Sequence, residues 1–215
     1  MPNIQLVIFD CDGVLVDSEP IANRVLARML EELGLELTQA QIFDNFVGYS
    51  IPHCLQVIER LLGRPPPENF RSELQARTFA AFRTELRAMQ GIAEALDALE
   101  QQYCVASSGD HEKMRTTLGI TGLLPRFEGR LFSVTEVARG KPAPDVYLHA
   151  AARCGADPRR CIVVEDTPPG VKAGAAAGMT VFGFCAHTPR EMLLRAGAHL
   201  TFERMSALPE LVRAM

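Results

Sequence analysis

Two aspartates stand one residue apart directly after the first apolar run of the chain. The run covers residues 4–9, and Asp10 and Asp12 follow it in the stretch DCDG. Carboxylates this close repel each other and resist removal from water, so holding them beside a buried strand is costly without a cation. The spacing therefore predicts a site that uses both carboxylates together with a cation.

The ends of three further predicted strands also carry groups that can do chemistry. Ligands of an open parallel sheet gather beyond the carboxyl ends of its strands, so we expect these groups on one rim. Carboxylates suit Mg²⁺, which binds through one or two of them, water and substrate phosphate. Lysine, hydroxyl and backbone N–H groups suit phosphate oxygens. A magnesium and phosphate site is therefore predicted, from Ser107-Ser108-Gly109, Gly140-Lys141-Pro142 and Glu165-Asp166-Thr167.

Short apolar runs alternate with helical patterns through most of the sequence. Because the runs are apolar on both faces, they indicate parallel strands covered by helices on both sides. We therefore expect an α/β fold with a Rossmann-like parallel sheet. Strands are predicted at 4–9, 104–107, 131–133, 161–165, 180–184 and 199–202, and helices at 91–101, 110–119, 144–154, 168–177, 189–196 and 206–213.

One region interrupts this alternation and reads as a helical bundle inserted after the first strand. Helical patterns cover 21–34, 51–63 and about 68–87, and the first two stop at a glycine. We expect a core of residues 1–17 and 88–215 and a helical domain of residues 18–87. Asp17 and Glu19, where the strand gives way to the insert, are expected to have a hinge or solvated role.

Composition excludes several classes of function. The formal net charge is −4 and the basic residues are scattered, so we expect no nucleic-acid or membrane partner. No apolar run approaches the ~20 residues of a membrane span, and no basic segment begins the chain, so a cytoplasmic protein is expected. The six cysteines form no C-x-x-C pair and are interpreted as reduced thiols. Monomer is the default oligomeric state.

Four motifs in this order resemble those of the haloacid dehalogenase (HAD) superfamily. They are DCDGVLVDS, the strand ending in Ser107, Lys141 in GKPAPD, and VVEDTPPGVKAGAAAGM, and they span essentially the whole chain. The insert resembles the helical cap found in β-phosphoglucomutase and phosphoglycolate phosphatase. A closer resemblance, to bacterial 6-phosphogluconate phosphatases, lies in FDCDGVLVDSE, CVASSGDHEKM, LFS and VFGFCA.

The resemblance implies a role for each motif residue. Asp10 would attack phosphorus to form an aspartyl-phosphate, and Asp12 would act as general acid and then general base. Ser107 and Lys141 would stabilise the phosphoryl oxygens, and Ser107 would also cap its helix. The implied Mg²⁺ ligands are Asp10, the backbone carbonyl of Asp12, Asp166, and Glu165 directly or through water. Since dehalogenases of the superfamily lack an aspartate at position 12, phosphoryl transfer is favoured over carbon–halogen cleavage.

The implied substrate is a small phosphorylated sugar or sugar acid, with 6-phosphogluconate as the first candidate. Ser108 and the cap loop Gly48-Tyr49-Ser50 are expected to contact it, and its carboxylate would need a cation. The alternatives are a β-phosphoglucomutase-like mutase, a phosphoglycolate phosphatase and an idle scaffold that binds a phosphometabolite. The mutase pattern has a histidine and an arginine where this chain has Ala22 and Ile51, and no motif residue is lost as a scaffold would require. The candidate cations are Arg24, Arg77 and Lys113.

Overall fold

The computed structural model describes residues 4–49 and 51–215. Its centre is one parallel sheet in the order β3-β2-β1-β4-β5-β6, which confirms the predicted Rossmann-like α/β fold. Every predicted strand is present, with β1 and β2 shifted by two residues at their starts. The strands are β1 (Leu6–Phe9), β2 (Gln102–Ser107), β3 (Leu131–Ser133), β4 (Cys161–Glu165), β5 (Thr180–Phe184) and β6 (Leu200–Phe202).

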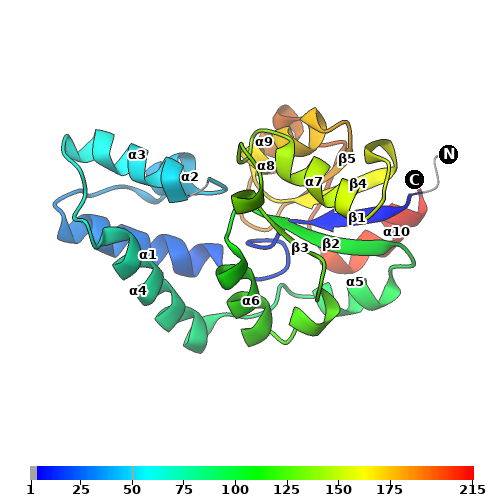
Figure 1. The fold of residues 1–215 in the computed structure, drawn as a ribbon, viewed down its shortest axis with the longest axis horizontal. Helices are drawn as coiled ribbons and strands as arrows, with labels where there is room; N and C mark the ends of the chain where they lie inside the picture. Colours follow the sequence, from blue (N-terminus) through cyan, green and yellow to red (C-terminus); the bar gives the residue numbers. More distant parts are fainter. Residues whose placement is uncertain (1–3, 50) are drawn as a thin grey trace.

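Helices cover both faces of this sheet, as Figure 1 shows. Because successive strand residues point to opposite faces, Val7 and Phe9 of β1 join one apolar cluster and Leu6 and Ile8 join another. The first cluster packs against α5 (Ile92–Ala98), α6 (His111–Ile120) and α10 (Leu208–Arg213). The second packs against α7 (Asp145–Arg153), α8 (Pro168–Ala176) and α9 (Arg190–Ala196). Short 3₁₀ helices cover Leu124–Arg126, Val134–Glu136, Pro158–Arg160 and Met205–Ala207.

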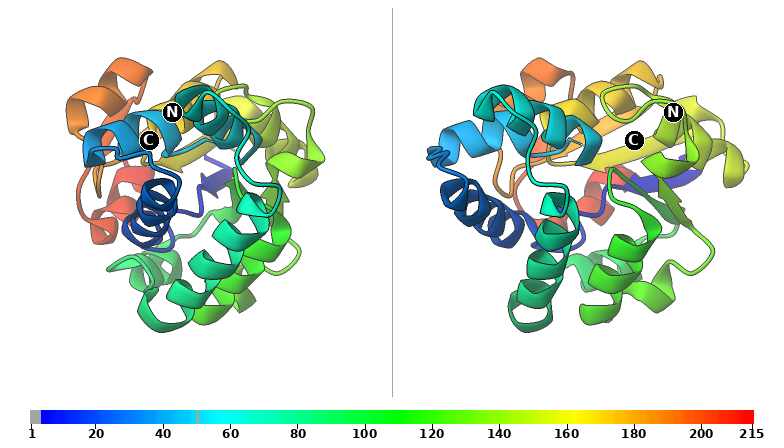
Figure 2. Two further views of the ribbon diagram at one scale, coloured as in Figure 1. Left: turned by 90° about the vertical axis from the view of Figure 1, so that its left-hand side faces the viewer. Right: turned by 60° about the vertical axis from the view of Figure 1, so that its left-hand side comes forward.

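A helical cap stands at one end of the sheet, beyond the carboxyl end of β1 (Figures 1 and 2). Its own apolar cluster is separate from the two that flank the sheet. For α2 the sequence predicted no range; it starts with a capping box in which Thr38 and Gln41 bond reciprocally. The four cap helices are α1 (Glu19–Glu32), α2 (Gln39–Phe46), α3 (Ile51–Leu62) and α4 (Phe70–Glu85).

The chain enters and leaves the cap side by side. Asp17 N donates to the Arg87 carbonyl (3.0 Å) and Met89 N to the Leu15 carbonyl (2.9 Å), and Val16 and Ala88 form an antiparallel bridge. The boundaries expected at 17/18 and 87/88 lie beside these contacts and stay a prediction. No helix among residues 4–49 and 51–215 is long and apolar enough to cross a membrane.

Candidate active site

The structure places the predicted motif residues on the wall of one cavity between the sheet and the cap, except Asp166, which is buried just beyond the end of β4. Asp10 prolongs β1 by donating its backbone N–H to the Val164 carbonyl of β4 (3.0 Å), so its side chain leaves the sheet at the carboxyl edge. The cavity has a volume of about 520 Å³, within the usual range for a small-molecule site. The predicted site residues that line it are Asp10, Asp12, Gly48, Tyr49, Ser107, Ser108, Lys141 and Glu165. The predicted residue Ser50 lies outside the described residues.

Lys141 is the buried cation of the site. Its Nζ donates to Asp10 Oδ1 (2.5 Å), Glu165 Oε1 (2.8 Å) and the Ala106 carbonyl (3.1 Å), and its side chain is 1% exposed. Burial opposes a charged amine, but Asp10 and Glu165 outweigh it and raise the pKa of Lys141 well above its ordinary value. Lys141 therefore brings a permanent positive charge to the strand ends.

Asp10 is buried among several charges of both signs. The pKa of Asp10 is raised to about 7, mainly by burial; Lys141 opposes this rise, while Glu165 and Asp12 contribute to it. A cation bound beside the carboxylate would favour its ionised, nucleophilic form. The environment of Asp10 therefore calls for one more positive charge than Lys141 supplies.

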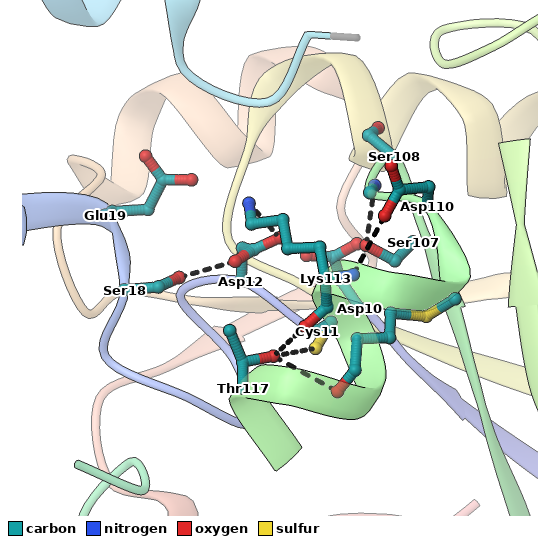
Figure 3. Close-up of polar contacts among 12 residues, drawn as sticks. Asp10, Cys11, Asp12, Ser18, Glu19, Ser107, Ser108, Asp110, Lys113 and Thr117 are labelled. Atoms are coloured by element: carbon teal, nitrogen blue, oxygen red, sulfur yellow. Dashed lines mark hydrogen bonds and ion pairs between the residues drawn. The ribbon is translucent and has the colours of Figure 1, made fainter. Parts of the chain in front are cut away.

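Asp12 is held by partners that Asp10 does not share (Figure 3). Its Oδ1 accepts a hydrogen bond from Ser18 Oγ (2.6 Å), and its Oδ2 accepts one from Lys113 Nζ (2.9 Å). Burial would raise the pKa of Asp12, but Lys113 and Ser18 bring it below its usual value. The two aspartates of the DCDG stretch thus have different surroundings although they are one residue apart.

Ser107 and Ser108 hold the turn that follows β2. Ser107 is fully buried, and its Oγ accepts a hydrogen bond from Gly109 N (3.0 Å). The expectation that Ser107 caps the following helix is wrong: α6 is capped by Asp110, which accepts from Lys113 N (2.8 Å) and lies closer to the first helical turn. Ser108 Oγ donates to the Gly48 carbonyl (3.4 Å) and so joins this turn to the cap loop.

Glu165 has no free acceptor position. Oε1 accepts from Lys141 and from Tyr147 OH (3.0 Å), and Oε2 accepts from the backbone N–H (2.8 Å) and hydroxyl (2.9 Å) of Thr167. A Cβ at Gly170 would lie 1.7 Å from Oε1, so the carboxylate fits only against a glycine. Four hydrogen bonds use all the lone-pair positions of a carboxylate, which argues against direct metal ligation by Glu165.

Asp166 has the opposite character, because its Oδ1 is buried without a hydrogen-bond partner among the described residues. Burial, Glu165 and Asp10 raise the pKa of Asp166 well above its ordinary value. Its other oxygen faces Gly13, where a Cβ would lie 2.1 Å from Oδ2 and where φ is +76°. A buried carboxylate with an unused oxygen fits a hard cation.

The donor set is also the right size for Mg²⁺. Within residues 4–49 and 51–215, no three His, Cys, Asp or Glu side chains converge as a complete metal site. Mg²⁺ needs only one or two carboxylates when backbone, water and substrate phosphate complete its shell. The side chains of Asp10 and Asp166 meet that requirement.

The cations expected to meet the substrate carboxylate are placed differently from the prediction. Arg24 pairs with Glu85, and Arg77 pairs with Glu32 (2.6 Å) and Glu73 (2.8 Å). The cavity wall contains neither of these arginines, but it contains Lys113 and Arg71. Both partners of each of these ion pairs are exposed, so Arg24 and Arg77 lie on the outer surface of the cap. Helical spacing alone could not show on which side of the cap they lie.

Glu19 and Arg71 are among the cavity residues that were not recognised as site residues from the sequence. Glu19, expected at a hinge or in solvent, lines the cavity, where burial and Asp12 raise its pKa to about 7. Arg71 lies on the first turn of α4 and shares its helix face with the wall residues Leu74 and Gln75. The sequence offered one signal for Arg71, its spacing of three and four residues from Leu74 and Gln75. This signal could be used only once it was known which face of α4 lines the cavity.

Comparisons with known proteins extend over the whole chain. A family model of haloacid dehalogenase-like hydrolases matches residues 4–178. The 6-phosphogluconate phosphatase of Escherichia coli is 35% identical over 219 residues, covering 100% of this chain and 97% of that protein. A haloacid dehalogenase-like protein from Agrobacterium tumefaciens has a TM-score of 0.85 and 34% identity, covering 99% of each chain. A HAD family hydrolase from Deinococcus radiodurans, with bound phosphate and sodium, has a TM-score of 0.79 and 32% identity, covering 100% of this chain and 97% of that one.

Proposed function

We propose that this chain, a phosphatase, hydrolyses a phosphorylated sugar acid through an aspartyl-phosphate on Asp10. The chain belongs to the haloacid dehalogenase-like hydrolase family. One observation carries the proposal. The Asp10 carboxylate lies at the wall of a cavity of substrate size and is paired with the buried Lys141, and Asp166, just beyond β4, has a buried Oδ1 with no partner among the described residues. This arrangement supplies a nucleophile together with the positive charge that a phosphoryl group requires.

In the first step an oxygen of Asp10 forms a bond to phosphorus while the bond from phosphorus to the substrate oxygen breaks. Asp12 is ionised beside Lys113 and Ser18, so it takes up a proton when the bound substrate changes these surroundings, and it then gives that proton to the leaving oxygen, which departs as an alcohol. In the second step Asp12 takes a proton from water, whose oxygen attacks phosphorus and releases inorganic phosphate and free Asp10. Ser18 and Lys113 position Asp12 for both transfers through their hydrogen bonds to its two oxygens.

Lys141 and the turn after β2 would stabilise the negative charge of the phosphoryl group during its transfer. Lys141 is fixed by Glu165, which is itself fixed by Tyr147 and Thr167. Ser107 is held in place by its bond from Gly109 N and would donate its hydroxyl proton to a phosphoryl oxygen. Because these donors are buried and already oriented, little reorganisation is needed when charge develops.

Mg²⁺ is the proposed cofactor, held by the side chains of Asp10 and Asp166 and the backbone carbonyl of Asp12. When bound, it would neutralise phosphate charge and favour ionised Asp10. Asp166 supports this assignment because its free oxygen and its close fit to Gly13 leave it no other evident task.

Substrate selection is assigned to the cap. Ser108 joins Gly48 of the cap loop to the catalytic turn, and Tyr49 lines the same cavity. A Cβ at Gly48 would come within 2.8 Å of Thr167, so the loop can approach the strand ends only with a glycine there. Closure of this loop would place the sugar and exclude bulk water while Asp10 attacks phosphorus, and its reopening would admit the water of the second step. The 6-phosphogluconate activity named for the E. coli relative makes that sugar acid the first substrate to test.

A mutase is a weaker candidate. Ala22 and Ile51 both line the cavity, at the positions where the mutase pattern has a histidine and an arginine. An alanine and an isoleucine offer no charge to hold a second phosphoryl group through a transfer cycle. Net release of phosphate is therefore the expected outcome.

The test is phosphate release by purified protein with Mg²⁺ and 6-phosphogluconate, phosphoglycolate or β-glucose 1-phosphate. Asp10→Asn should lower kcat by at least ~10³-fold while leaving the circular dichroism spectrum unchanged, because it removes the nucleophile. Asp97→Asn is the matched control, since Asp97 lies on α5 and pairs with Arg126 on the surface. Full activity of the Asp10 variant would sink the nucleophile assignment, and interconversion of glucose phosphates without phosphate release would favour the mutase.

A further inference from the structure

The cavity continues from the catalytic residues along one face of α4. Phe79 and Thr78 line it near the sheet, and Gln75, Leu74 and Arg71 line it further out. These positions recur at intervals of three and four residues, which places them on one side of the helix. The cavity is therefore an elongated site with α4 as one wall.

The direction along α4 follows from its packing. Phe79 packs against the apolar cluster of the sheet, whereas Leu74 packs against the cluster of the cap. Arg71 precedes Phe79 by eight residues, so their backbones are separated by about 12 Å along the helix axis. Arg71 therefore stands at the end of the cavity that lies away from Asp10.

Arg71 is the cation of this wall that has no partner. Lys141 is neutralised by Asp10 and Glu165, and Lys113 is neutralised by Asp12. Arg71 has no ion pair or hydrogen bond with any residue that the structure describes, and it is exposed to the cavity and solvent. Its guanidinium is available for a ligand.

The near end of the cavity has the opposite electrostatic preference. Asp12 and Glu19 line it, and a carboxylate placed close to them would be repelled. Between the two ends the wall carries the neutral amides of Asn23 and Gln75, whose nitrogens donate to Glu19 (3.5 Å) and Glu112 (3.0 Å). Their amide oxygens can accept hydrogen bonds, so this middle section suits hydroxyl groups as donors.

We infer that Arg71 is a specificity residue that binds the carboxylate at the far end of a phosphorylated sugar acid. A guanidinium offers two parallel N–H donors to a carboxylate, a geometry that a lysine lacks. A substrate with its phosphoryl group at Asp10 and several hydroxylated carbons before its carboxylate would span the two ends. A two-carbon acid would leave its carboxylate near Asp12 and Glu19, and the site should discriminate against it.

This inference rests on the proposed phosphatase function and is tested by a ratio of rates. The values of kcat/KM are measured for 6-phosphogluconate and for glucitol 6-phosphate, which has the same carbon chain and no carboxylate. Arg71→Gln should lower the ratio of acid to neutral substrate about tenfold, the lower range for a charge-assisted hydrogen bond at an exposed position. The loss should lie mainly in KM, because the contact is made equally in the ground and transition states. Arg71→Lys should restore part of the ratio.

The matched control is Arg77→Gln, because Arg77 lies on the same helix but pairs with Glu32 and Glu73 outside the cavity. This control should leave the ratio unchanged. If Arg71→Gln leaves the ratio unchanged, or if the wild-type protein hydrolyses glucitol 6-phosphate but not 6-phosphogluconate, the assignment of Arg71 is overturned while the phosphatase function stands. If the wild-type protein releases phosphate from neither substrate, the proposed function fails, and the Arg71 inference fails with it.

Discussion

Removing the buried charge of Lys141 should destabilise the fold as well as stop the reaction. Lys141→Met keeps the approximate length of the side chain but leaves Asp10 and Glu165 without their cation. Both carboxylates have side chains no more than 9% exposed, and both lie within 2.8 Å of the lysine Nζ. Breaking a buried ion pair by removing one partner costs about 3–5 kcal/mol. We expect a loss of about 4 kcal/mol in the free energy of unfolding, near the middle of that range.

The same reasoning predicts that Glu165→Gln partly rescues Lys141→Met. The single Glu165 variant should cost about 2 kcal/mol, because Lys141 keeps Asp10 as a partner. In the double variant one of the two unpaired buried charges is gone. The double variant should therefore be about 2 kcal/mol more stable than the sum of the two single effects predicts.

Urea denaturation followed by circular dichroism gives the four free energies of this cycle. The measurement is made with EDTA, so that no metal ion neutralises Asp10, and the slope against urea should be the same for all four proteins. Additive effects, or a loss below ~1 kcal/mol for Lys141→Met, would show that Lys141 is not the compensating charge of the strand ends.

Two further substitutions test the metal site and the near wall. Gly13→Ala should reduce the stabilisation that Mg²⁺ gives against urea, because the Cβ of the alanine would displace the Asp166 carboxylate and φ at this position is +76°. If Mg²⁺ shifts the urea midpoint of this variant as much as that of the wild-type protein, the assignment of Asp166 is contradicted. Between the ordinary pKa of 4.5 and its raised value of about 7, native Glu19 holds a proton that the unfolded chain has lost, so Glu19 makes stability fall as pH rises through this interval. Glu19→Gln should then be more stable than the wild-type protein at pH 8 by about 1 kcal/mol, after allowance for partial exposure, and equally stable at pH 4. An advantage of this variant at pH 4 alone would reverse the sign and refute the argument.

Most of the fold could be predicted from local sequence patterns, namely apolar runs of strand length and the residues that follow them. The runs CIVVE and TVFGF form β4 and β5 with the predicted bounds, because strands buried on both faces need continuous apolar residues and tolerate few others. The strand-end rule then places Asp10, Ser107 and Lys141 together without any knowledge of distances. The short helix α2 was harder to predict, because its eight residues span only about two turns and bury only Ile42 and Phe46.

Side-chain partners were the part that patterns could not supply. Glu165 and Asp166 are adjacent acids at the end of β4, and the sequence assigns both of them to the metal site. Because successive residues of an extended chain point in opposite directions, Glu165 turns toward Tyr147 and Lys141 while Asp166 turns toward Gly13. Which direction is occupied by hydrogen-bond donors depends on α7, α8 and the loop before them, and no local signal encodes that.

The different surroundings of the two aspartates solve the electrostatic problem of the DCDG stretch. Each carboxylate has its own lysine, and the two lysines come from different elements: Lys141 from the loop before α7 and Lys113 from α6. Because Lys141 is nearly inaccessible whereas Lys113 is partly exposed to the cavity, an arriving substrate can displace Lys113 from Asp12 more readily than it can displace Lys141 from Asp10. A nucleophile needs a constant environment, and an acid that later acts as a base needs one that changes during the cycle. The unequal burial of Lys141 and Lys113 therefore distinguishes the nucleophile Asp10 from the acid and base Asp12, which their positions in the sequence alone do not.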